Sequence, residues 1–162
     1  MRDRASAIRS ILDRHGRGAV YIASTGYVSR AVHELAGTDY CAFYMQGSMG
    51  LAPAIGLGLA LRTDRDVVVI NGDASLLMCL GTTHTLRDHA PPTLFHYVLD
   101  NGCHESVGGQ PAAHLESGYP GVTEILKISR DGKPPRVAVG PVENTREVRA
   151  FVTEVPERSS AR

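Results

Sequence analysis

The sequence shows no excess of charge of either sign. Its 17 Lys and Arg residues balance its 17 Asp and Glu residues, so the formal net charge at pH 7 is zero. A balanced chain gives no reason to expect nucleic acid or an anionic membrane surface as a partner. No apolar run approaches the length of a membrane-spanning segment, so the bilayer is not an expected environment either.

Cysteine is also scarce, and the three that occur are Cys41, Cys79 and Cys103. An odd number at uneven spacing does not suit a disulfide framework or a zinc site, and it fits a reducing compartment. The first residues form an amphipathic pattern and lack the long apolar core of a secretory signal. We therefore expect a cytoplasmic protein.

A dinucleotide-binding fingerprint is missing as well. Gly56 and Gly58 come nearest to it, but no glycine-rich turn directly follows a strand there. Glycine and alanine instead crowd residues 46–61, a predicted helix that another backbone or a cofactor could approach closely. An NAD-binding domain is therefore the least favoured of the alternatives.

What the sequence does contain is an alternation of apolar runs and amphipathic segments. The runs predict strands at 19–23, 40–45, 67–70, 94–99 and 136–139. The amphipathic segments predict helices at 5–14, 28–35, 46–61, after Gly72 and at 144–152, while 123–129 suits either a short helix or a strand. The helix after Gly72 is expected to turn Leu76, Leu77 and Leu80 inward. This order predicts an α/β fold, a three-layer αβα sandwich with a mostly parallel sheet, over residues 1–155, followed by a disordered polar tail at 156–162.

Polar residues follow two of the predicted strands. Asp73 comes after the strand at 67–70, and Asn101 comes after the strand at 94–99. The ends of parallel strands share one edge of a sheet, where ligands bind in open α/β folds, so these residues can meet. Their carboxylate and amide oxygens suit Mg²⁺ or Ca²⁺. The alternative is an Asp that caps a helix and an Asn in a turn.

The spacing of these residues resembles the signature of thiamine-diphosphate enzymes, which is GDG, a gap in the mid-twenties, and NN. Here the two ends are Gly72-Asp73-Ala74 and Asp100-Asn101, separated by the 25 residues 75–99, and Ala74 and Asp100 depart from the signature. Further segments that carry the resemblance are 24–26, 47–50, 72–78, 99–106 and 108–110. The chain thus resembles the diphosphate-binding domain of thiamine-diphosphate decarboxylases, especially those acting on phosphonopyruvate and sulfopyruvate.

The resemblance implies a role for each part of the site. Mg²⁺ would be held by Asp73, the Asn101 side chain and the backbone carbonyl of Cys103, and would neutralise the cofactor diphosphate. The cofactor-binding residues that it implies are Thr25, Gly26, Gly47, Ser48, Met49, Gly72, Asp73, Ala74, Ser75 and Asn101. Met49 would fill the bend between the two cofactor rings. His104 and Glu105 are the catalytic candidates, with His104 moving a proton or contacting an anionic group of the substrate.

Several of these residues have a plainer alternative. Met49 could be an ordinary core residue, Ser75 a helix cap, and His104 a surface residue. Glu105 could be solvated beside it. Cys103 invites interpretation as a nucleophile, but no His–acid spacing supports that.

The resemblance also implies a partner. Enzymes of this class need a carboxylate from a pyrimidine-binding domain at N1′ of the cofactor, and a chain of this length has room for one of the two domains. We therefore expect a pyrimidine-binding α subunit that supplies the catalytic Glu, in a hetero-oligomer. The implied reaction converts phosphonopyruvate to phosphonoacetaldehyde and CO₂, or sulfopyruvate to sulfoacetaldehyde and CO₂. The alternatives are a carboligating subunit of the acetolactate-synthase type and a degenerate, non-catalytic partner subunit.

Overall fold

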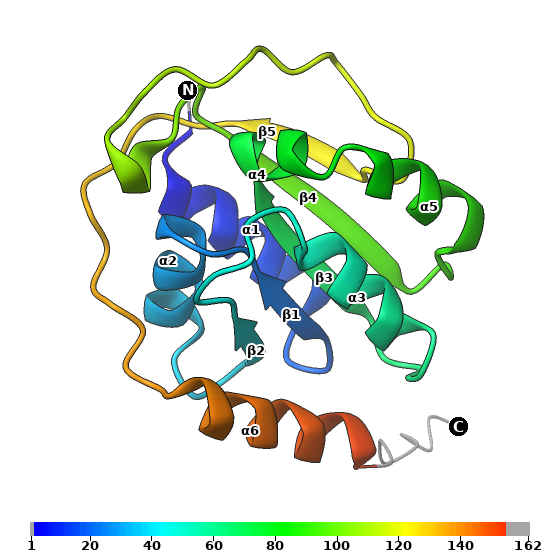
Figure 1. Ribbon diagram of the computed structural model, residues 1–162. Coiled ribbons are helices and arrows are strands. Elements are labelled where there is room, and N and C mark those ends of the chain that lie inside the picture. Colours follow the sequence, from blue (N-terminus) through cyan, green and yellow to red (C-terminus); the bar gives the residue numbers. More distant parts are fainter. Residues whose placement is uncertain (1, 155–162) are drawn as a thin grey trace.

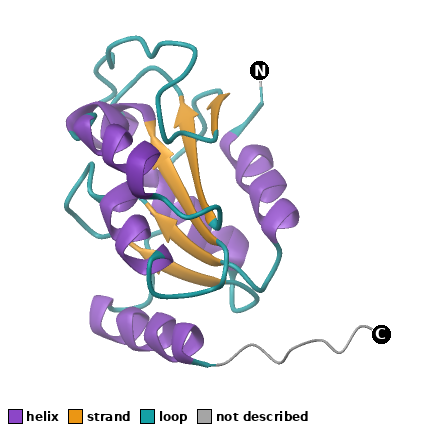
Figure 2. Ribbon diagram, turned by 90° about the vertical axis from the view of Figure 1, so that its right-hand side faces the viewer, coloured by secondary structure: helices purple, strands orange, loops and turns teal. Residues whose placement is uncertain are grey.

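The computed structural model describes residues 2–154, so the predicted tail at 156–162 lies outside the described residues. Five parallel strands form one sheet between layers of helices (Figures 1 and 2). The strands are β1 (Val20–Ala23), β2 (Cys41–Tyr44), β3 (Val67–Gly72), β4 (Leu94–Asp100) and β5 (Glu124–Lys127), in the order β2-β1-β3-β4-β5. The predicted αβα architecture is confirmed, and the ambiguous segment at 123–129 contains a strand.

The helices are α1 (Arg4–His15), α2 (Tyr27–Ala36), α3 (Ala52–Ala60), α4 (Asp73–Met78), α5 (Gly81–His89) and α6 (Pro141–Thr153), with a short 3-10 turn, η1 (Glu105–Val107). Helices α1 and α2 cover one face of the sheet, and α3 and α6 pack on the other, with α5 beside α3 (Figure 2). Within residues 2–154, no helix has the length and apolar character to cross a bilayer.

The middle of the sheet is buried on both faces, which explains its continuous apolar runs. In β3, Val68 and Ile70 pack toward α1 and α2, while Val67 and Val69 pack toward α3. A Cβ added to Gly56 would lie 2.4 Å from a Val69 methyl carbon, so α3 lies directly on β3 only because Gly56 has no side chain. At Gly56 it is the Val69 side chain that lies close to the helix, and neither another backbone nor a cofactor.

The prediction of a strand at 136–139 is wrong. These residues run irregularly past α2 toward α6, which begins at Pro141, ahead of the predicted start at Asn144 (Figure 1). The Asn144 side chain instead bonds to the outer edge of β2: its Oδ1 accepts from Tyr44 N at 2.9 Å, and its Nδ2 donates to Ala42 O at 2.8 Å. Because this amide already occupies the edge of β2, an added strand finds no partner there.

The helix after Gly72 is shorter than the apolar pattern suggests. It ends at Met78, and a new helix begins at Gly81. Leu76 is buried as predicted, but the chain turns at Cys79 and leaves Leu80 37% exposed. The prediction that Leu80 points inward is therefore wrong, because the inward register is lost at this turn.

Candidate functional site

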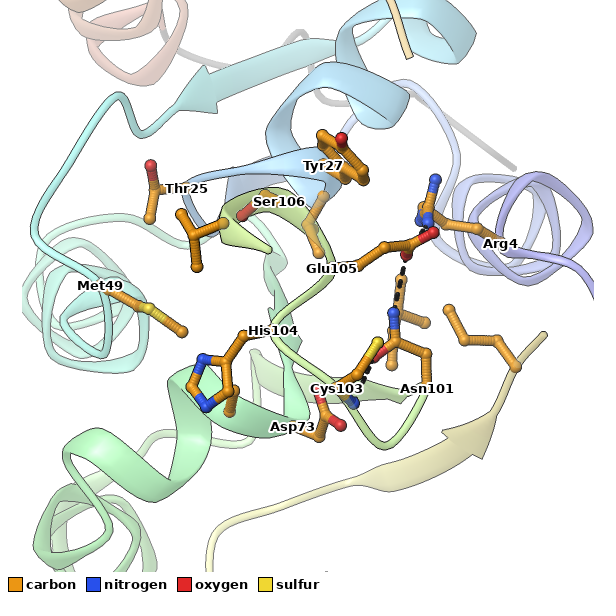
Figure 3. Close-up of a pocket in the computed structure, with 15 residues that line it drawn as sticks. Arg4, Thr25, Tyr27, Met49, Asp73, Asn101, Cys103, His104, Glu105 and Ser106 are labelled. Atoms are coloured by element: carbon orange, nitrogen blue, oxygen red, sulfur yellow. Dashed lines mark hydrogen bonds and ion pairs between the residues drawn. The ribbon is translucent and has the colours of Figure 1, made fainter. Parts of the chain in front are cut away.

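The loops that follow β1, β2, β3 and β4 converge at the carboxyl edge of the sheet and form a pocket (Figure 3). Eight of the predicted site residues line it: Thr25, Met49, Asp73, Ala74, Asn101, Cys103, His104 and Glu105. Gly26, Ser48, Gly72 and Ser75 do not line the pocket but adjoin lining residues in sequence, and Gly47 lies one residue further away, in the loop before α3. The structure thus gathers most of the set that the sequence proposes.

Asp73 stands where β3 passes into α4. It is only 3% exposed, and its Oδ2 accepts a hydrogen bond from Gly102 N at 2.8 Å, which joins it to the loop after β4. Burial raises the pKa of Asp73, and the nearby Asp100 charge raises it further. Among residues 2–154, no Lys, Arg or His forms an ion pair with Asp73. A buried carboxylate in this situation favours a bound cation or a proton.

Asn101 lies at the start of the loop after β4, and both ends of its amide are held. Its Oδ1 accepts from Cys103 N at 3.1 Å, and its Nδ2 donates to Glu105 Oε2 at 2.8 Å. Glu105 also forms an ion pair with Arg4. The alternative of a solvated Glu105 is therefore wrong, because this carboxylate is engaged on the wall of the pocket.

The backbone of the loop orients Cys103. Gly102 O accepts from Ala112 N at 2.9 Å, and His104 N donates to Gln110 O at 2.8 Å, so these flanking residues make the bonds to the returning strand segment. The Cys103 N–H faces away from this segment and donates to Asn101 Oδ1. Burial also raises the pKa of the Cys103 thiol, which disfavours the thiolate that a nucleophile requires.

Ser75 does not act as a simple helix cap. Its buried hydroxyl lies 2.9 Å from Ser24 Oγ and accepts from Gly50 N at 2.9 Å. The side chain therefore ties together the loops after β1, β2 and β3. The Ser75 hydroxyl is therefore engaged within the fold.

Two tight turns shape the other side of the pocket. Gly26 has φ of +92°, and a Cβ there would lie 2.9 Å from Ser106 Oγ, so only glycine permits this approach. Ser48 has φ of +55° and is the one non-glycine residue with positive φ in the described part of the chain. The next residue, Met49, is only partly buried and lines the pocket, so it is not a core residue.

His104 is held by its own backbone. Its carbonyl accepts from Val107 N at 3.1 Å and from Gly109 N at 3.0 Å, which closes the loop on itself. Its imidazole lines the pocket and is partly buried (Figure 3). The alternative of a surface residue outside the site is therefore not supported by its position.

Sequence reasoning missed Arg4 and Tyr27, which also line the pocket. The Arg4 guanidinium carbon lies 5.5 Å from the centre of the Tyr27 ring, and Arg4 itself is only 3% exposed. The signal was present in the sequence, because Arg4 is on the same helical face as Ile8 and Ile11. A charged residue on an apolar stripe calls for a buried partner.

These features define an α/β domain with a parallel sheet. Its pocket lies at the carboxyl ends of the strands and is lined by several side chains that carry oxygen atoms. Residues 23–139 match the family described as "Thiamine pyrophosphate enzyme, C-terminal TPP binding domain". The match covers well over half of the chain, and the chain belongs to this family. Thiamine pyrophosphate is the same compound as thiamine diphosphate.

Curated relatives agree with this family. A phosphonopyruvate decarboxylase of Streptomyces viridochromogenes is 37% identical, with 94% of this chain and 47% of the relative aligned. A second one, of Streptomyces hygroscopicus, is 46% identical over 66% of this chain and 26% of the relative. A sulfopyruvate decarboxylase subunit beta of Methanothermobacter thermautotrophicus is 44% identical over 55% of this chain and 48% of the relative. The chain therefore spans about half or less of the length of these relatives.

Proposed function

We propose that this chain is the diphosphate-binding subunit of a thiamine-diphosphate-dependent 2-oxo acid decarboxylase. Its substrate class would be 3-substituted pyruvates, such as phosphonopyruvate or sulfopyruvate. The observation that carries the proposal is the meeting of the buried Asp73 with the Asn101 loop at the carboxyl edge of the sheet. The names of the similar proteins support the substrate class.

The residues at this edge fit a magnesium ion. Asp73 offers a buried carboxylate that has no cationic side-chain partner among residues 2–154, and Asn101 offers an amide oxygen. The Cys103 carbonyl, on the same short loop, would be the third donor. Such a mixed set of oxygen donors is what Mg²⁺ prefers when phosphate groups complete its coordination.

The diphosphate would lie against backbone N–H groups of the two turns that follow β1 and β3. These two strands are neighbours in the sheet, and the strand order reverses between them. The two turns are the one at Thr25 and Gly26 and the one at Ala74 and Ser75. Helix α4 has only six residues, so its dipole is small, and individual N–H groups supply most of the attraction. Because Gly26 has no side chain, its turn packs directly against Ser106 of the loop after β4.

The bound cofactor would supply the electron sink that accepts the electron pair released when the carboxylate is lost as CO₂. Met49 would hold the cofactor's bend from the pocket wall, since its flexible, apolar side chain adapts to the rings. The His104 imidazole, on the same wall, would move a proton or contact the anionic substituent of the substrate.

A partner is part of the proposal. The carboxylates that line the pocket are Asp73 and Glu105, and the contacts described above engage both. Apolar side chains stand exposed where α3 begins and α4 ends, among them Leu51 and Met78, and these two ends adjoin through Gly50. An α subunit with a pyrimidine-binding domain would cover this surface and supply the Glu, in a hetero-oligomer.

The test is to assay CO₂ release from phosphonopyruvate and from sulfopyruvate with thiamine diphosphate and Mg²⁺. The chain alone should be inactive and should gain activity when a pyrimidine-domain protein is added. Robust turnover by the chain alone would contradict the split-subunit proposal. Adding an aldehyde acceptor separates decarboxylation from carboligation by product, and failure of the reconstituted pair to bind cofactor would favour a degenerate partner subunit.

A further inference from the structure

Arg4 enters the pocket from the first turn of α1, far from the signature in sequence (Figure 3). Its guanidinium forms an ion pair with Glu105, and its Nη1 lies 3.4 Å from Gly132 O. Its backbone N donates to Asp131 Oδ2 at 2.6 Å. A buried cation at the start of α1 therefore contacts both the loop after β4 and the loop after β5.

The contact continues from Arg4 to the cation ligands. The Glu105 Oε2 atom that pairs with Arg4 also accepts a hydrogen bond from Asn101 Nδ2 at 2.8 Å. An amide has one donor end and one acceptor end, so fixing Nδ2 on Glu105 also fixes the direction of Oδ1. That oxygen points to the backbone of Cys103, next to Gly102, whose N–H bonds to Asp73.

We propose that Arg4 and Glu105 are positioning residues of the cation site. Arg4 holds Glu105, and Glu105 holds the Asn101 amide with its oxygen, not its nitrogen, facing the cation. This inference rests on the proposed role of Asp73 and Asn101 as magnesium ligands. It also gives Glu105 a different role from the catalytic one that the resemblance implies, because Arg4 and the Asn101 amide both engage the same Glu105 carboxylate oxygen.

The support of Arg4 is itself rigid. Arg2, just before it, forms a parallel bridge with Ile128, and Ser129 N donates to Arg2 O at 2.9 Å. Asp3 caps α1 by accepting from Ser6 N at 2.6 Å. The start of α1 is thus fixed on the segment after β5. Such outer contacts commonly govern how well a ligand side chain is oriented toward its metal.

The experiment measures binding of Mn²⁺, a paramagnetic stand-in for Mg²⁺, to the full chain in saturating thiamine diphosphate. Electron paramagnetic resonance detects the free ion. The main variant is the double substitution Arg4→Met and Glu105→Leu, which removes both charges together and so leaves neither one buried alone. It should weaken Mn²⁺ binding about tenfold or more. Glu105→Gln keeps an acceptor oxygen for Asn101 and should bind Mn²⁺ nearly as the unaltered chain does.

Two controls separate the possible outcomes. Arg9→Met removes an exposed Arg from the same helix and should leave Mn²⁺ binding unchanged. Asp73→Asn tests the cation site itself: if it leaves binding unchanged, the proposed function is wrong at its first step. If Asp73→Asn abolishes binding while the double variant, shown to be folded by urea titration, binds normally, the positioning role is overturned. Should the double variant not fold, Glu105→Leu alone takes its place: weaker Mn²⁺ binding than in Glu105→Gln would support the positioning role, and equal binding in these two variants would overturn it.

Discussion

Asp100 and Lys127 lie opposite each other in register on β4 and β5, and their side chains form an ion pair. Asp100 is 5% exposed, and its charge helps to raise the pKa of Asp73. It is also one of the two residues that depart from the thiamine signature. Lys127, on the neighbouring strand, pairs with the negative charge that Asp100 brings in place of the Asn of the signature.

Lys127→Met should therefore destabilise the fold. It leaves Asp100 buried beside Asp73 without its counter-charge, and because Lys127 is itself mostly exposed, the free energy of unfolding should fall by about 1 kcal/mol. Urea titration near neutral pH measures this. Arg17→Met, which breaks the exposed pair with Asp39, is the matched control and should change stability much less. Equal effects of the two substitutions would contradict a special role for Lys127.

Asp73→Asn should separate folding from cofactor binding. Asn keeps an acceptor oxygen for Gly102 N. It also removes a carboxylate whose charged form is disfavoured by burial, which raises the pKa of Asp73, so the thermal midpoint without ligands should not fall. The rise in midpoint that Mg²⁺ and thiamine diphosphate give the unaltered chain should disappear, because the charged ligand is gone. Calorimetry of cofactor binding provides the second measurement, and unchanged affinity in this variant would refute the metal assignment.

Met49 and Met45 form a natural pair for comparison, since Met45 is buried in the core and Met49 lines the pocket. Met45→Ala should lower the free energy of unfolding by about 2–5 kcal/mol. Met49→Ala should cost much less stability yet weaken cofactor binding and turnover of the reconstituted enzyme. Met49→Leu roughly conserves volume and should cost under about 1.5 kcal/mol. A parallel loss of stability and binding in Met49→Ala would support the core interpretation instead.

The sequence predicted the centre of the fold well because burial there leaves a direct mark. Strand β3 is buried on both sides, and its continuous apolar run admits few other structures. The same parallel order carried Asp73 and Asn101 to one edge, so their meeting could be expected from the order of strands and helices along the chain. Local pattern and global topology agree at these positions.

Where prediction failed, the deciding contact came from a distant part of the chain. Residues 136–139 have the pattern of a strand, but Asn144 already bonds to the free edge of β2. Arg4 lies about a hundred residues from Glu105 in sequence, and no local spacing joins them. The sequence pattern of a segment shows which secondary structure that segment can form by itself. The structure of residues 136–139 and the pairing of Arg4 depend instead on which polar groups elsewhere in the fold still need a partner.

His96 offers a test of burial by pH. It lies on β4, is 1% exposed, and its Nε2 is 3.4 Å from Asn71 Nδ2. Burial lowers the pKa of His96 from 6.5 to about 4. A protonated imidazole is therefore disfavoured in the folded chain, while the unfolded chain binds a proton at the ordinary pKa.

This difference gives stability a definite dependence on pH. Between pH 6.5 and about 4 the unfolded chain binds a proton that the folded chain does not, so stability falls as pH falls through this window. Above it, His96 is neutral in both states and contributes no slope. From about pH 7.5 to about pH 5, its share of the lost free energy of unfolding should be about 2 kcal/mol. His96→Gln should remove that share in urea titrations at the two pH values, whereas His84→Gln, at an exposed site, should keep it. An unchanged pH dependence in His96→Gln would mean that His96 titrates normally in the folded chain.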